Sequence, residues 1–145
     1  KDLKAVSGGY DFVIIDGAPQ IAKMSVAAVK AANLVLIPVQ PSPYDIWACA
    51  DLVDIITARQ EVTDGLPLAY FLISRAIKNT KLGNEIKSAL VDYELPVMKT
   101  YTTQKVAYPT TAAEGKTVFN EPASSAAKEI TAIKTEIMEI VNYGA

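Results

Sequence analysis

The chain alternates short apolar runs with longer segments in which apolar residues recur at helical spacing. The apolar runs cover 10–16, 34–39, 68–74 and, more briefly, 97–100. Their length and their β-branched and aromatic residues are typical of buried strands. Helices are predicted over 21–32, 44–60, 80–92 and 122–142, with a short helix and loop at 102–113. Strands and helices in this order form βαβ units, so the pattern predicts an α/β fold whose parallel sheet has helices on both faces.

The final predicted helix has one apolar face, formed by Ile130, Ile133, Ile137 and Ile140. Charged residues occupy its other positions: Lys128, Glu129, Lys134, Glu136 and Glu139. This arrangement predicts a helix that covers the sheet and turns its charges elsewhere. A membrane-surface helix needs a basic polar face, whereas this helix carries more acids than bases, so no membrane partner is expected.

The run at 10–16 is the most informative one because it ends in a carboxylate. Four consecutive apolar residues, 12–15, predict a strand buried on both faces, and Asp16 follows where that strand emerges. Ligands of α/β proteins bind at the carboxyl ends of parallel strands, and an acid beside phosphates is a suitable partner for Mg²⁺, usually through water. The alternative is an aspartate that starts a turn or caps the next helix.

Composition limits the chemistry that the chain can carry. Its 145 residues suffice for one domain with a substantial core, and half of them are hydrophobic. The single cysteine, Cys49, and the absence of histidine exclude disulfide frameworks, zinc sites and histidine-based acid–base catalysis within this chain. We therefore expect a reducing, cytoplasmic setting and interpret Cys49, in an apolar stretch, as a structural thiol.

Charge is distributed unevenly along the chain. Residues 75–116 carry seven basic and four acidic side chains, whereas the whole chain has a net charge of −2. Such a stretch is interpreted either as a surface that faces a polyanion or as a set of ordinary surface lysines.

The order of these motifs resembles that of the ParA/MinD family of deviant Walker ATPases, and particularly the small plasmid-partition ATPases of the ParF type. The resemblance rests on the strand at 10–19, on the stretch 34–48, on the strand that ends at Arg75, and on the pattern at 112–119 and 126–130. It implies a doubly wound fold like that of P-loop NTPases. The family's Gly-rich loop and second signature strand do not occur in these 145 residues. We therefore interpret residues 1–145 as the C-terminal portion of a single nucleotide-binding domain, and expect about 60–80 further upstream residues that carry the N-terminal strands and P-loop.

The resemblance gives roles to residues at three strand ends. Asp16 matches the Walker B aspartate that helps to hold Mg²⁺ beside the phosphates, and Gly17 and Ala18 lie where the backbone passes a nucleotide or the opposite subunit. Arg75 matches a position near the adenine or ribose, with a surface arginine as the alternative. Where relatives close over the base, this chain has Thr100, Tyr101 and Thr102; the tyrosine either stacks on a purine or simply packs.

Two further sets of residues follow from the resemblance. The loop formed by Gln40, Pro41, Ser42 and Pro43 matches a rim of the subunit contact or nucleotide site; the alternative is a stiff turn in which Ser42 or Asp45 caps the next helix. Candidates for non-specific contacts with DNA phosphates are Lys81, Lys105 and Lys116.

The function implied by the resemblance is an ATPase, dependent on ATP and Mg²⁺, that partitions plasmid or chromosomal DNA. Its ATP-bound homodimer binds DNA non-specifically in the cytoplasm, at the nucleoid, and a centromere-binding partition protein stimulates hydrolysis and release. Without the P-loop, these 145 residues alone are expected to be inactive. The alternatives are a metabolic or maturation P-loop enzyme of the same fold and a truncated, non-catalytic dimerisation or adaptor module. The lone Cys49 counts against an iron–sulfur role, which needs more thiolates.

Overall fold

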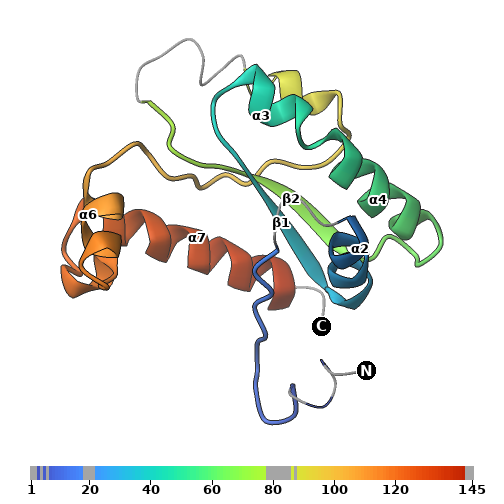
Figure 1. Cartoon of the computed structure of the whole chain (residues 1–145), viewed down its shortest axis with the longest axis horizontal. Coiled ribbons are helices and arrows are strands. Elements are labelled where there is room, and N and C mark those ends of the chain that lie inside the picture. Colours follow the sequence, from blue (N-terminus) through green and yellow to red (C-terminus); the bar gives the residue numbers. More distant parts are fainter. Residues whose placement is uncertain are drawn as a thin grey trace. The chain divides into compact units, whose positions relative to one another are not determined.

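The computed structural model describes residues 3, 5, 7–17, 22–77, 86 and 88–142. Its regular elements are shown in Figure 1: α2 (Ala22–Ala31), β1 (Leu34–Val39), α3 (Pro43–Trp47), α4 (Ala50–Glu61), β2 (Leu68–Ile73), α6 (Ala107–Ala113), η1 (Val118–Asn120) and α7 (Ser125–Asn142). The chain forms two compact units. One comprises Lys1–Val35 and Asp51–Leu68, and the other comprises Leu36–Ala50 and Ala69–Ala145.

The sheet is parallel, as the order of elements predicts. Strands β1 and β2 are hydrogen-bonded neighbours. The amide of Leu68 donates to Asn33 O at 3.0 Å, and that of Ser74 donates to Val39 O at 2.8 Å. The start of β2 thus pairs with the start of β1 and its end with the end of β1, so the two strands run in the same direction. On the other side of β2, parallel bridges join Phe71 to Val97 and Ala76 to Thr103. Residues 97–104 therefore form a third, irregular line of the sheet, close to the strand predicted at 97–100.

Each unit has its own apolar interior. In the second unit, Phe71 and Leu90 are fully buried, and Phe71 makes an edge-to-face contact with Tyr93 at 5.9 Å between ring centroids. In the first unit, Ile56 of α4 is fully buried. A smaller cluster joins α6, η1 and α7 in the second unit and consists of Val118, Ala126 and Ala127, with Ala107, Tyr108 and Ile130 packed against it. Among the described residues, none of the helices combines the length and apolar character needed to cross a bilayer.

The helix predicted over 44–60 is interrupted in the structure. Helix α3 ends at Trp47, and α4 begins at Ala50 after a turn. The Cys49 thiol donates to Asp45 O at 3.1 Å, and the Cys49 amide donates to Ile46 O, also at 3.1 Å. In a continuous helix the amide of Cys49 would bond to Asp45 O instead. The Cys49 amide thus bonds one residue closer than in an α-helix, which marks the turn between α3 and α4.

The buried strand predicted at 10–16 is wrong for this structure. Residues 12–17 have no regular secondary structure, and the side chain of Ile14 is 93 % exposed. Tyr10 and Phe12 are exposed as well. A strand is stabilised by hydrogen bonds to neighbouring strands, and this segment pairs with neither β1 nor β2. The apolar side chains of this segment are therefore left exposed by the described part of the chain.

The other predicted elements are confirmed within one to three residues at most of their boundaries. These are the helix at 21–32, the strands at 34–39 and 68–74, the short helix within 102–113, and the final helix. For the predicted helix at 80–92, residues 86 and 88–91 are helical, and the remainder of its N-terminal part lies outside the described residues.

Candidate functional site

The carboxyl ends of three parallel lines of the sheet meet in the second unit. Gln40 follows β1, Arg75 follows β2, and Thr102 lies in the third line. The amide of Ser74 bonds to Val39 O, and the amide of Thr102 donates to Ile73 O at 3.1 Å, so these ends are directly linked. Parallel sheets bind their ligands at this edge. The structure thus brings together parts of three predicted site segments that are far apart in the sequence.

Arg75 has an unusual backbone at this edge. Its φ angle is +56°, in the left-handed region that side chains other than glycine rarely adopt. Its amide donates to Thr102 Oγ1 at 3.1 Å. The side chain is exposed and forms no ion pair with any other described residue. Arg75 therefore presents a free guanidinium beside the strand ends, as a residue that recognises a base, ribose or phosphate would.

The three residues Thr100, Tyr101 and Thr102 have different surroundings. The Thr100 hydroxyl donates to Glu136 Oε2 at 2.6 Å, so α7 already holds this side chain. Tyr101 is 41 % exposed, which leaves its ring accessible. Thr102 faces β2. Stacking of Tyr101 on a base thus stays a prediction, while the Thr100 hydroxyl is bound to α7.

Helix α7 contributes a pair of carboxylates that hold the outer side of residues 99–103. Glu136 accepts from the amides of Lys99 and Thr100 at 2.7 and 2.8 Å. Glu129 accepts from the amide and hydroxyl of Thr103 at 3.0 and 2.7 Å. The two glutamates are seven residues apart, which is about 10.5 Å along a helix, and three or four strand residues span a similar distance. We call this pair the α7 clamp.

The charge pattern of the final helix did not predict the α7 clamp, because both glutamates lie among residues expected to be surface charges. Charge alone does not separate a glutamate bound to a strand from one in solvent. The signal in the sequence was the combination of the seven-residue spacing with Thr100 and Thr103, two hydroxyls at matching spacing on a strand.

Glu129 also collects two other donors. Lys105 Nζ lies 2.9 Å from Glu129 Oε1, and the Tyr108 hydroxyl donates to Glu129 Oε2 at 2.8 Å. The Lys105 and Glu129 side chains are only 18 % and 17 % exposed. Lys105, a predicted DNA contact, is thus held within the protein, where it neutralises a carboxylate.

These contacts shift proton affinities. Burial raises the pKa of Glu129, but hydrogen bonds from Thr103, Lys105 and Tyr108 outweigh it and lower the pKa to about 2. Burial likewise raises the pKa of Glu136, and bonds from Thr100 and Lys99 lower it overall. The pKa of Tyr108 is raised, first by burial and then by Glu129. Both glutamates of the α7 clamp are therefore ionised near neutral pH.

The loop 40–43 is a tight turn attached to α3. The Gln40 amide donates to Asp45 Oδ2 at 3.1 Å, and the Ser42 carbonyl accepts from the Ile46 amide at 3.2 Å. Ser42 occupies the N-cap position of α3 but makes no side-chain capping bond, and Pro43 begins the helix. Asp45 thus ties the loop back to α3, but neither Ser42 nor Asp45 bonds an amide at the helix start, so the capping role is not observed. A role at a nucleotide or subunit rim stays a prediction.

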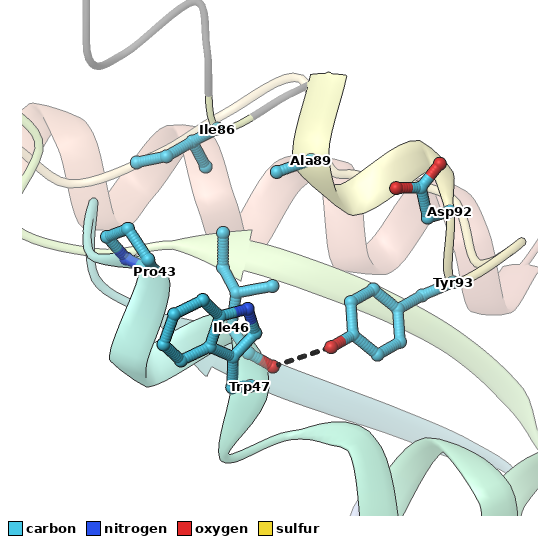
Figure 2. Close-up of a pocket in the computed structure, with 7 residues that line it drawn as sticks. All are labelled: Pro43, Ile46, Trp47, Ile86, Ala89, Asp92 and Tyr93. Atoms are coloured by element: carbon cyan, nitrogen blue, oxygen red, sulfur yellow. Dashed lines mark hydrogen bonds between the residues drawn. The ribbon is translucent and has the colours of Figure 1, made fainter.

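A pocket of about 310 Å³ lies beside this turn in the second unit. It is lined by Pro43, Ile46, Trp47, Ile86, Ala89, Asp92 and Tyr93 (Figure 2). The Tyr93 hydroxyl donates to Ile46 O at 3.1 Å and ties the two walls together. Burial raises the pKa of the nearby Cys49 thiol, and Asp45 raises it further, so this thiol is a poor nucleophile. The pocket contains Pro43 but neither Arg75 nor any residue of 100–102, so it is separate from the carboxyl edge.

The structure leaves the predicted Mg²⁺ residue without surrounding ligands. Asp16 and Gly17 are exposed in the segment without regular structure, and Ala18 lies outside the described residues. No group of three or more carboxylate or thiol side chains suited to a metal occurs in the described part. A single carboxylate fits Mg²⁺ only where nucleotide phosphates and waters complete the coordination shell.

The two remaining lysine candidates differ in what the structure says of them. Lys81 lies outside the described residues. Lys116 is exposed and pairs with Glu114 at 3.0 Å, a surface contact that leaves its charge accessible to a polyanion.

Known proteins match this chain over most of its length. Residues 1–66 match a family model described as an AAA domain. The chain is 26 % identical over 141 residues to the maintenance of carboxysome distribution protein A of Halothiobacillus neapolitanus, covering 95 % of this chain and 65 % of that protein. It is 25 % identical over 138 residues to the sporulation initiation inhibitor protein Soj of Bacillus subtilis, covering 93 % of this chain and 54 % of that protein.

A third relative is an uncharacterized protein of Methanocaldococcus jannaschii, which is 26 % identical over 140 residues, covering 88 % of this chain and 52 % of that protein. The chain spans between about half and two thirds of the length of these curated relatives.

Proposed function

We propose that this chain, which resembles the ParA/MinD-like deviant Walker ATPases, is part of a nucleotide-switched ATPase that positions DNA. The observation that carries the proposal is the convergence of Gln40, Arg75 and Thr102 at the carboxyl edge of a parallel sheet. This is the edge at which nucleotide-binding α/β proteins hold their ligand.

Two residues at this edge are proposed to contact the base and sugar of a nucleotide, as the resemblance implies. Arg75 supplies an unpaired guanidinium that can stack on a purine or donate to ribose oxygens, and Tyr101 supplies an accessible ring. Asp16 would hold Mg²⁺ through water, and the ion would neutralise charge on the β- and γ-phosphates. The phosphate-binding loop itself would come from residues outside these 145.

In the proposed cycle, ATP favours a homodimer that binds DNA through phosphate contacts, and hydrolysis releases it. Of the two predicted DNA-contact lysines that the structure describes, Lys116 is the one whose charge is exposed, and we assign it to such contacts. A centromere-binding partner would control the hydrolysis step. The cargo is proposed to be a plasmid or chromosome.

A second candidate cargo follows from one relative. The protein of Halothiobacillus neapolitanus is named for maintaining carboxysome distribution. A chain of this family can therefore be proposed to distribute a protein assembly, with DNA as the surface on which it acts. The two versions share the nucleotide switch and differ only in the partner that stimulates hydrolysis.

The test measures DNA binding by the gene product that carries this chain. Fluorescence anisotropy with non-specific duplex DNA is recorded with ATP, with ADP and without nucleotide, at several salt concentrations. We expect binding with ATP and Mg²⁺ only, weakening by about tenfold or more between 50 and 200 mM salt, because phosphate contacts release counterions. Asp16→Asn should abolish the ATP dependence, whereas Asp11→Asn, a matched exposed aspartate on the same segment, should not.

The outcomes separate the alternatives. DNA binding that is the same with and without nucleotide would contradict the proposal that nucleotide controls DNA binding. ATP consumption that requires an added small-molecule substrate would indicate a metabolic enzyme of the same fold. Partner binding without any affinity for ATP would indicate an adaptor module.

A further inference from the structure

The left-handed backbone of Arg75 needs an explanation. For a residue with a Cβ atom, this region costs roughly 1 kcal/mol or more relative to extended or helical backbone. Such a conformation persists only where neighbouring contacts hold it. In this structure the contact to the Arg75 amide comes from the Thr102 hydroxyl, at 3.1 Å.

The amide, carbonyl and hydroxyl of Thr102 all form hydrogen bonds with residues at the end of β2. Its amide donates to Ile73 O at 3.1 Å, its carbonyl accepts from the Ala76 amide at 2.9 Å, and its hydroxyl accepts from the Arg75 amide. The residues from Ile73 to Ala76 are therefore fixed from one side by one threonine. A valine has the same shape but offers no acceptor to the Arg75 amide.

Thr102 is itself held in place. The amides on either side of it in the third line bond to the α7 clamp, at Thr100 and at Thr103. The clamp therefore makes Thr102 a fixed support from which the Arg75 backbone is positioned.

We propose that Thr102 is a positioning residue, which holds Arg75 in its left-handed conformation so that the guanidinium faces the base or ribose of a bound nucleotide. The inference rests on the proposed nucleotide-binding function and adds to it a residue that acts through another.

The first measurement requires no nucleotide. Amide hydrogen exchange of the wild-type gene product is compared with that of Thr102→Val and Thr102→Ser. We expect the Arg75 amide to exchange about tenfold faster in the valine variant, because it loses its acceptor, and to remain protected in the serine variant. Unchanged protection of Arg75 in the valine variant would overturn the inference whatever the protein binds.

The second measurement is a double-mutant cycle on nucleotide affinity, by calorimetry with MgATP and with magnesium tripolyphosphate. Thr102→Val should weaken MgATP binding by about three- to tenfold and leave tripolyphosphate binding unchanged, and Thr102→Ser should restore MgATP binding. In an Arg75→Ala background, Thr102→Val should cause no further loss. An equal loss in both backgrounds would show that Thr102 acts by another route and would overturn the inference.

Controls keep the two proposals distinguishable. Thr131→Val removes a hydroxyl that bonds within α7, to Ala127 O, and should leave MgATP affinity unchanged. Failure of the wild-type protein to bind MgATP would overturn the proposed function and this inference together. Binding that is insensitive to Thr102→Val would overturn the inference alone. Should the valine variant not fold, Thr102→Ala replaces it in the same cycle.

Discussion

Residues 10–17 and residues 97–104 have opposite relations between sequence pattern and structure. The first segment contains one of the most apolar runs of the chain, yet its described residues form no strand and Ile14 is 93 % exposed. The second mixes Lys99, Thr100 and Thr103 with fewer apolar residues, yet it is bonded to β2 on one side and to α7 on the other. The difference teaches that a strand is specified by its partners as much as by its own hydrophobicity.

The contrast between the segments should be largest for side-chain truncation. Met98 is 2 % exposed, so Met98→Ala leaves a cavity and should lower the free energy of unfolding by about 2–4 kcal/mol. Ile14→Ala should change it by less than about 0.5 kcal/mol in this 145-residue chain. Urea denaturation followed by circular dichroism measures both. A large cost for Ile14→Ala would mean that the segment is packed in solution.

Removing one glutamate of the α7 clamp should have the next largest effect on the free energy of unfolding. Glu129→Ala leaves the amide and hydroxyl of Thr103 without their acceptor and Lys105 without its ion-pair partner, and should cost about 2–3 kcal/mol in the same unfolding measurement. Glu139→Ala is the matched control, since that glutamate is exposed on the same helix, and should cost less than about 0.5 kcal/mol. Equal effects of the two variants would show that the clamp does not stabilise the third line.

Acid should weaken the clamp in a defined pH range. The pKa of Glu129 is about 2 in the folded protein and 4.5 ordinarily, so its stabilisation is present above pH 4.5 and is lost as the pH falls toward 2. The unfolding free energy should therefore fall by about 1–2 kcal/mol more in wild type than in Glu129→Gln across this range. Parallel pH profiles for the two proteins would contradict the bonding pattern. Thermal unfolding at half-unit pH steps provides the comparison.

The smallest expected effects distinguish the two described lysine candidates. Lys116→Ala removes only an exposed pair, so it should change stability by less than about 0.5 kcal/mol while lowering the salt slope of ATP-dependent DNA binding by about one. Lys105→Ala should do the reverse, costing about 1 kcal/mol of stability with little change in the slope. A lower salt slope of DNA binding for Lys105→Ala would indicate that Lys105 does contact DNA.

Where the local pattern and the tertiary contacts agreed, the sequence predicted the fold well. The apolar run that became β1 and the isoleucine face of α7 are examples, because burial of one continuous face requires little information from elsewhere. The break at Cys49 was not predictable in this way. It is a local change of backbone hydrogen bonding, in which the Cys49 amide bonds to Ile46 O, and hydrophobic periodicity does not indicate such a change.

The resemblance assigned Arg75 and Thr102 to the same ligand, and the structure joins them by a hydrogen bond, while their role at a nucleotide stays a prediction. The contacts that hold these residues were not predicted. Nothing in the local sequence of 99–103 indicated that carboxylates more than 25 residues later would bond to its amides. Such long-range bonds are set by the docking of α7 and not by the segment itself.

The α7 clamp also decides in which direction the sheet can grow. Outward-facing amides at the margin of a sheet are the groups with which an incoming strand pairs. Carboxylates already occupy those of Lys99 and Thr103, so an added strand would first have to displace a helix. Extension is therefore directed to the opposite margin, at β1, whose only strand partner among the described residues is β2. Any strand added to this sheet would then join it on one side only, next to β1.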